Sequence, residues 1–140
     1  MQPVKIRILS TNSDAQSFEQ RYTGTMTAKD GKYYVMYSED EQSGLTNTKT
    51  TLKWDDERVI ILRSGSVEHR QEFCMGLADK SLYRTPYLDI PMTTQTTYLD
   101  TRFARGTWQL QLECKLLHGD EPYDERKILI EIEEDTEVGH

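Results

Sequence analysis

The chain has 140 residues, a length that suits a single domain spanning residues 1–140. Its 17 Lys and Arg residues stand against 24 Asp and Glu residues, and the resulting net charge of -7 argues against nucleic acid or an anionic bilayer as the main partner. The hydrophobic share is only 36%, but the apolar residues occur in short, regularly spaced runs, which excludes a disordered polar chain.

Strand-like segments follow one another through the first half of the chain. Apolar and polar residues alternate from Val4 to Ile8, the period of a strand that is buried on one face. Segment 17–27 is next, and Gly24 allows it to bulge or coil sharply. Asp30-Gly31 is suited to a tight hairpin turn, because both residues tolerate positive φ. The further strands expected in this half are 32–37, 46–54, 59–64 and 67–75, with turns at 55–57 and at Gly65.

The second half of the chain continues the pattern with more interruptions. Segment 76–82 is expected to be a loose connection. Segment 83–88 contains Pro86, which marks an edge, a bulge or a strand end because proline cannot donate a ladder hydrogen bond. Strands are then expected over 92–102, 108–117 and 126–134, with turns at Gly106 and 118–120, and the acidic tail from about residue 135 is expected to fray.

No window of helical length shows apolar residues at three- and four-residue spacing with caps at its ends, so the predicted class is all-β. About eight to ten short strands joined by hairpin turns remove their free edges best by closing into an antiparallel up-and-down barrel. A β-sandwich would give a similar pattern and stays an alternative.

Three groups of residues carry a resemblance to a known family. They are Asn47-Thr48-Lys49-Thr50-Thr51, Arg63-Ser64-Gly65 with Arg70-Gln71 and Phe73, and Thr85-Pro86-Tyr87 with Pro91. In these stretches the chain resembles the uncharacterised YwiB-like family of Firmicutes, and the opening and closing strands also fit. The resemblance implies a calycin-like, lipocalin-related β-barrel in a bacterial cytoplasm, with no agreed activity. Binding of small hydrophobic molecules by lipocalins is an analogy between folds and transfers to no residue here.

Location and cofactors follow from what the sequence lacks. The amino end has no apolar core of signal-peptide length, and no run of about eighteen apolar residues occurs, so we expect a cytoplasmic protein without membrane insertion. Cys74 and Cys114 lack CxxC or CxxH spacing, so we expect reduced thiols and neither a disulfide nor a zinc site. The histidines His69, His118 and His140 are too scattered to form a metal triad. No cofactor is expected, and the chain is expected to be a monomer or a homodimer.

Candidate ligand-binding residues come from parity, because successive side chains of a strand point to opposite faces. Arg63 shares the parity of Val59 and Ile61, while His69 and Gln71 share that of Val67 and Phe73. If the Val and Phe residues mark the interior, these polar residues also point inward. The same reasoning gives inward sets in two other strands, namely Thr46, Thr48, Thr50, Leu52 and Trp54 in one and Thr93, Gln95, Thr97 and Leu99 in the other.

A guanidinium inside a barrel costs several kcal/mol unless a carboxylate, backbone carbonyls or an anionic ligand pairs with it. One interpretation makes Arg63 a structural residue that closes the barrel mouth. The other is a polar cavity in which Arg63, Gln71 and the hydroxyls of Thr48 and Thr50 bind a small anion or a carboxylate-bearing ligand. Arg70 has the opposite parity and exchanges roles with Arg63 only if a bulge shifts the register.

Tyr83 and Tyr87 flank Pro86, whose rigid backbone could hold their rings at a pocket rim. No serine lies in a GxSxG context and no glycine-rich loop has phosphate-binding spacing, so no catalytic residue is assigned. We therefore expect a barrel that binds a small molecule, with an anionic or amphipathic one as the candidate. The alternatives are an adaptor that uses the barrel exterior with the acidic loop 39–41 and, more weakly, an enzyme with Arg63 as electrophile and His69 as base.

Overall fold

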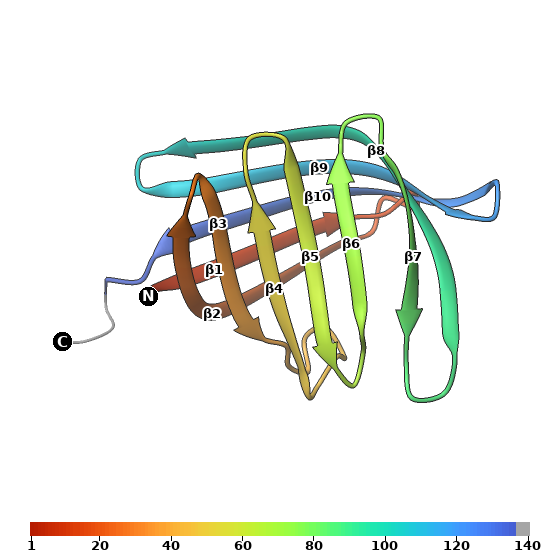
Figure 1. Ribbon diagram of the computed structural model, residues 1–140, viewed down its shortest axis with the longest axis horizontal. Helices are drawn as coiled ribbons and strands as arrows, with labels where there is room; N and C mark the ends of the chain where they lie inside the picture. Colours follow the sequence, from red (N-terminus) through yellow and green to blue (C-terminus); the bar gives the residue numbers. More distant parts are fainter. Residues whose placement is uncertain (137–140) are drawn as a thin grey trace.

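The computed structural model describes residues 1–136, which form ten antiparallel strands and no helix (Figure 1). The strands lie in one sheet in the order β6-β5-β4-β3-β2-β1-β10-β9-β8-β7, and they form a nearly closed barrel, as predicted. Among these residues no helix is long and apolar enough to cross a membrane. The strands are β1 (Gln2–Thr11), β2 (Ser17–Lys29), β3 (Lys32–Ser38), β4 (Thr48–Trp54), β5 (Arg58–Gly65), β6 (His69–Cys74), β7 (Ala78–Arg84), β8 (Asp89–Ala104), β9 (Thr107–His118) and β10 (Glu121–Glu134).

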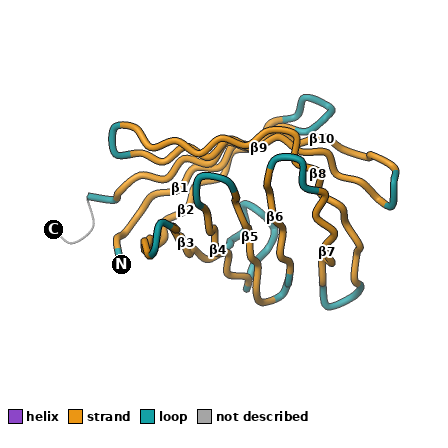
Figure 2. Tube along the Cα trace, turned by 45° about the horizontal axis from the view of Figure 1, so that its top comes forward, coloured by secondary structure: helices purple, strands orange, loops and turns teal. Residues whose placement is uncertain are grey.

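Two groups of strands cross each other around the interior. β1, β9 and β10 run behind β3 to β6 and across them (Figure 1), and the turned view in Figure 2 shows them as a separate layer. Gly24 in β2 lies close to the neighbouring strand, because an added Cβ would stand 2.3 Å from the carbonyl oxygen of Met36. The register of β1 with β2 runs unbroken past this residue. Gly24 thus permits a close approach of two backbones, and no bulge forms there. The Asp30-Gly31 turn has positive φ at both residues, as its hairpin role requires.

The predicted boundaries were wrong around β7. Segment 76–82 was expected to be a loose connection, but Ala78–Arg84 is a strand paired residue by residue with the start of β8. Pro86 lies in the turn between these strands, where the Thr85 N–H donates to the Leu88 carbonyl at 3.0 Å. The sequence of β7 is mostly polar, and its inward residues are only half-buried. Its apolar signal was therefore too weak to predict the strand.

The inward face of β8 was also assigned wrongly. The register of β8 with β9 shifts between Thr96 and Tyr98, so one residue is inserted without a partner. Thr94 and Thr96 are 0% and 3% exposed and point inward, in place of the expected Thr93, Gln95 and Thr97. Leu99, beyond the shift, packs against the core as expected. A single extra residue reverses parity for the rest of a strand, and parity counting cannot detect it.

The carboxyl end is held more firmly than its acidic composition suggested. β10 begins at Glu121, five residues before the predicted start. Asp135, counted above with the fraying tail, is 6% exposed, and its N–H donates to the Pro3 carbonyl at 2.9 Å. His140 and the rest of the tail beyond residue 136 lie outside the described residues.

The interior changes character from one end of the barrel to the other. At the end where β4 stops, Trp54, Val59 and Phe73 are at most 1% exposed and pack in a hydrophobic cluster. At the end where β4 begins, the interior positions of this strand are polar, with Thr48 and Thr50 almost fully buried. This second half of the interior is called the polar end below.

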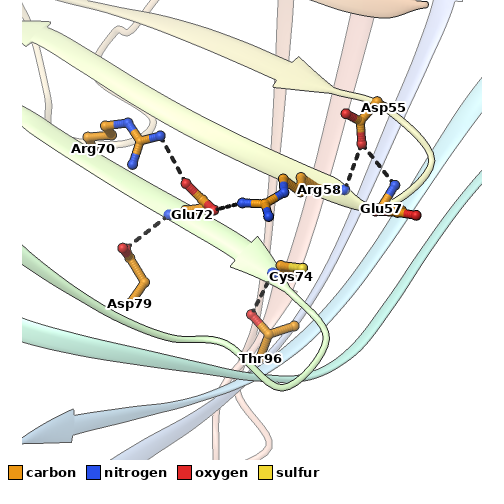
Figure 3. A network of polar contacts seen from close by, with 8 residues as sticks. All are labelled: Asp55, Glu57, Arg58, Arg70, Glu72, Cys74, Asp79 and Thr96. Carbon is orange, nitrogen blue, oxygen red and sulfur yellow. Dashed lines mark hydrogen bonds and ion pairs between the residues drawn. The ribbon is translucent and has the colours of Figure 1, made fainter.

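Side chains close the barrel between its two edge strands, β6 and β7. The backbones of this seam join at one isolated bridge, between Glu68 and Arg84. Further along, the Asp79 carboxylate accepts the Glu72 N–H at 3.0 Å, and the Thr96 hydroxyl on β8 accepts the Cys74 N–H at 3.3 Å (Figure 3). Because individual side chains replace a continuous ladder, we expect the wall to separate here more easily than elsewhere.

Candidate functional site

Four interior residues form a continuous row across the polar end. Tyr37 on β3 pairs with Thr50 on β4, Thr50 pairs with Arg63 on β5, and Arg63 pairs with His69 on β6. The row reaches β7 through the His69 imidazole, whose Nε2 lies 2.8 Å from the Ser81 hydroxyl. Directly opposed residues of neighbouring strands bring their side chains together on one face. These four residues are called the polar row below.

A buried carboxylate borders the polar row. Glu39 follows β3 and is 8% exposed, and the Thr50 hydroxyl donates to its carboxylate at 2.7 Å. The pKa of the Tyr37 phenol is raised, first by burial and then by the negative charge of Glu39. Tyr37 is therefore a neutral hydrogen-bonding group at any physiological pH.

Arg63 is half-buried and has no ion-pair partner in the described chain. No carboxylate of residues 1–136 lies within 4.0 Å of its guanidinium, and the buried Nε atom has no hydrogen-bond acceptor. A nearby carboxylate, that of Glu39, is already bonded to Thr50. The positive charge of Arg63 therefore lacks the direct protein partner that a structural arginine at the mouth was expected to have.

His69 is 5% exposed and is held between β7 and the polar row. Its ring meets the Tyr83 ring edge-on, with centroids 5.2 Å apart, and its Nδ1 atom has no hydrogen-bond partner in residues 1–136. Burial and, secondarily, the charge of Arg63 lower the pKa of His69 to about 4, although Asp79 opposes this. At neutral pH the imidazole is uncharged and a weak proton acceptor, which argues against its use as a general base.

Unpartnered polar atoms concentrate at this end. Four buried side-chain nitrogen or oxygen atoms lack a hydrogen-bond partner within the described residues, and three belong to Thr48, Arg63 and His69. The fourth, the indole nitrogen of Trp54, lies at the opposite end. Each such atom costs about 1 to 3 kcal/mol relative to a satisfied one. A hydrogen-bonding molecule in the polar end would offset part of this cost.

The other predicted ligand-binding residues lie around the polar row or away from it. The Gln71 side chain donates to the Thr94 hydroxyl at 2.8 Å, so its amide already has a partner. Arg70 is on the outer face and pairs with Glu72 at 2.9 Å (Figure 3). Tyr87 is 92% exposed in the turn after β7. The structure thus gathers Arg63, His69, Thr48 and Thr50, with Tyr83 and Gln71 beside them, and places Arg70 and Tyr87 elsewhere.

Sequence reasoning missed three members of this environment. Glu39 was assigned to an exposed acidic loop, but only Asp40 and Glu41 of that loop are exposed. Ser81 was hidden in the supposed loose connection. Tyr37 carried a usable signal, because it shares the parity of Val35 in a predicted strand.

A separate hollow lies on the outer wall of β1, β2 and β10. It measures about 740 Å³, and its lining includes Arg7, Arg21 and Glu131. Arg7 is paired with both Glu131 and Glu19, and Arg21 is paired with Glu19 at 2.8 Å. These charges already have partners and face solvent, where ion pairs contribute little. Unpartnered groups therefore point to the polar end rather than to this hollow on the outer wall. No cluster of three or more metal-ligating side chains occurs within residues 1–136.

Comparison with known proteins agrees with this geometry at the level of the fold. Residues 4–130 match the family model described as Domain of unknown function (DUF1934). The chain is 24% identical over 114 residues to the uncharacterized beta-barrel protein YwiB of Bacillus subtilis (strain 168), a match that covers 81% of this chain and 79% of that protein. The crystal structure of the ywiB protein from Bacillus subtilis superposes with a TM-score of 0.85 at 22% identity, covering 96% of this chain and 93% of that one.

Proposed function

The chain belongs to the family described as Domain of unknown function (DUF1934), and we propose that it binds a small monocarboxylate at the polar end of its barrel. The observation that carries this proposal is the half-buried guanidinium of Arg63, which has no carboxylate within 4.0 Å in residues 1–136. A ligand carboxylate would supply the missing charge, and arginine binds such groups through paired, charge-assisted hydrogen bonds.

The surroundings of Arg63 favour a singly charged ligand. The Thr48 hydroxyl and the Nδ1 atom of His69 offer hydrogen bonds that no group of residues 1–136 uses. The Glu39 carboxylate, held by Thr50, already places one negative charge beside the row. A dianion such as phosphate would meet this charge at close range, whereas a monoanion balances Arg63 with less repulsion.

An apolar rim beside the row suits the carbon chain of such a ligand. Tyr83 contacts His69 and pairs across the hairpin with Ile90, which is 38% exposed. The combination of a cation at depth and apolar side chains at the rim is typical of sites for amphipathic acids. The ligand class is therefore a carboxylate with a short apolar tail.

The barrel wall has to open before a ligand can reach the buried unpartnered atoms of the polar end. The unpartnered atoms of Thr48, Arg63 and His69 are closed off from solvent. His69 lies on β6, beside the seam where single side-chain contacts replace a ladder. Separation of β6 from β7 would expose the polar row, so we expect binding to be coupled to local opening of this seam. Because Cys74 and Cys114 are free thiols, we assign this activity to a reducing cytoplasm.

Calorimetric titration with butyrate tests the proposal, with acetate and phosphate as comparison ligands. We expect saturable binding of butyrate, weaker binding of acetate and none of phosphate. Arg63→Met should weaken butyrate binding by at least about tenfold while the fold is kept, because methionine is apolar and of similar length. Arg70→Met is the matched control, because Arg70 lies on the outer face, and should bind as the unmodified protein does. Glu39→Gln removes a nearby negative charge and should strengthen binding.

Two results would reject the proposal. One is equal butyrate binding by Arg63→Met and the unmodified protein. The other is absence of binding together with a melting temperature that falls in Arg63→Met whatever is added, which would make Arg63 a structural closure of the mouth.

A further inference from the structure

Aromatic rings gather at the end of the barrel opposite the polar row. Tyr33 and Trp108 lie with ring centroids 4.5 Å apart, and Phe103 and Trp108 with centroids 5.1 Å apart. Phe103 and Trp108 are directly paired near the tip of the β8–β9 hairpin. Phe103 is 59% exposed, while Tyr33 and Trp108 are partly buried against the core. The rings therefore form a surface that solvent can reach.

A small pocket opens against these rings. It has a volume of about 230 Å³, below the roughly 300 to 1,000 Å³ of sites for drug-sized molecules, and so fits a group of only a few heavy atoms. Its lining consists of Met26, Tyr33, Phe103, Gly106, Trp108, Ile132 and Glu134. Six of the seven residues are aromatic, aliphatic or glycine, and the remaining one is an acid.

The position of that acid departs from the pattern of its strand. Ile128, Ile130 and Ile132 share the inward face of β10, and Glu134 has the same parity. The strand thus places a carboxylate on the inward side, at the aromatic end, where its alternation calls for an apolar residue. Within residues 1–136 no cation pairs with this carboxylate. Glu134 and the rings of Tyr33, Phe103 and Trp108 line the same small pocket.

We propose that this pocket binds a small organic cation of the methylated or quaternary ammonium class. The faces of Tyr33, Phe103 and Trp108 would attract the diffuse positive charge through cation–π contacts, and Glu134 would neutralise it. Methyl groups on the nitrogen suit apolar walls, whereas a bare ammonium would lose hydration that this pocket cannot replace. The site is separate from the polar row, since the two occupy opposite ends of the barrel.

Choline tests the proposal against its neutral isostere, 3,3-dimethylbutan-1-ol, which has the same shape without the charge. The chain has two tryptophans, so the indole N–H signals of Trp54 and Trp108 can be followed in nitrogen-15 NMR spectra. We expect choline to shift the Trp108 signal in a saturable way at millimolar concentration, the range reached by ligands of few atoms. The isostere should bind several-fold more weakly.

Variants at the exposed end of the site avoid damage to the core. Glu134→Gln should weaken choline binding by about tenfold, and Phe103→Leu by several-fold, in line with the strength of charge and cation–π contacts. Phe18→Leu is the matched control, because Phe18 is a comparably exposed phenylalanine, 55% against 59%, on β2. If the isostere binds as tightly as choline, the pocket only packs apolar groups. If choline does not saturate the site up to about 50 mM, the rings only close the barrel end. Either result would overturn the proposal.

Discussion

Replacement of His69 by glutamine should change how the stability of the protein depends on pH. The glutamine amide can occupy the place of Nε2 beside the Ser81 hydroxyl, so the hydrogen bond at 2.8 Å has a substitute while the titrating group is lost. In the folded protein the pKa of His69 is lowered to about 4, against an ordinary value of 6.5. Between about pH 6.5 and pH 4 the unfolded chain therefore binds a proton at residue 69 that the folded chain does not bind.

The sign and size of the effect follow from this difference. As the pH falls from about 6.5 to about 4, the free energy of unfolding of the unmodified protein should decrease, and below pH 4 the contribution of His69 should level off. Between pH 7 and pH 4.5 the expected loss from this residue is about 2 kcal/mol. Asp124 titrates lower: burial opposes the shift, but hydrogen bonds from Ser13 and Arg126 hold its pKa at about 2. Its effect therefore falls below this window.

Urea unfolding of both proteins at several pH values between 4.5 and 7.5 measures the difference. The unmodified protein should lose about 2 kcal/mol more than His69→Gln on acidification. A bound carboxylate next to Arg63 would offset the positive charge that lowers the pKa of His69, so saturating butyrate should make the slope shallower. Parallel pH profiles of the two proteins would refute the assignment of a buried, neutral His69.

Four further substitutions, in two pairs, test the closure and the core of the barrel. Asp79→Ala removes the acceptor of the Glu72 N–H, so it should lower the free energy of unfolding by about 1 to 3 kcal/mol and speed amide exchange at Glu72. Asp100→Ala breaks a surface ion pair with Arg102 at 3.5 Å and should change the free energy of unfolding by less than about 0.5 kcal/mol. Equal effects of the two variants would contradict the role given to the seam. Trp54→Ala should lower the free energy of unfolding by about 3 to 5 kcal/mol because the indole is 1% exposed, and Trp108→Ala should lower it less because its ring is only partly buried. Denaturant unfolding measures both values, and a larger loss in Trp108→Ala would contradict this order.

The fold could be predicted from the sequence where its signals are local. Alternation over Val59 to Arg63 and the Asp30-Gly31 pair depend on neighbouring residues alone, and the structure agrees with both. The strand Ala78–Arg84 escaped prediction because it is polar and lies at the seam. The insertion at Thr97 reversed the parity of β8, which no local pattern reveals.

The candidate site was predictable only in part for a related reason. Parity placed Arg63, His69 and Thr50 on inward faces, since that property belongs to single strands. Their mutual contacts depend on the register between strands, which the sequence does not state. Burial of Glu39 depends on the path of a loop and on one hydroxyl of Thr50, and composition alone suggested an exposed acidic segment.

A crystal structure of the protein grown with butyrate would show directly which group contacts the guanidinium of Arg63. We expect the butyrate carboxylate within hydrogen-bonding distance of that guanidinium, close to the Thr48 hydroxyl, with the carbon chain against Tyr83. A guanidinium bonded to the Glu39 carboxylate or to backbone carbonyls, with no butyrate in the polar end, would contradict it.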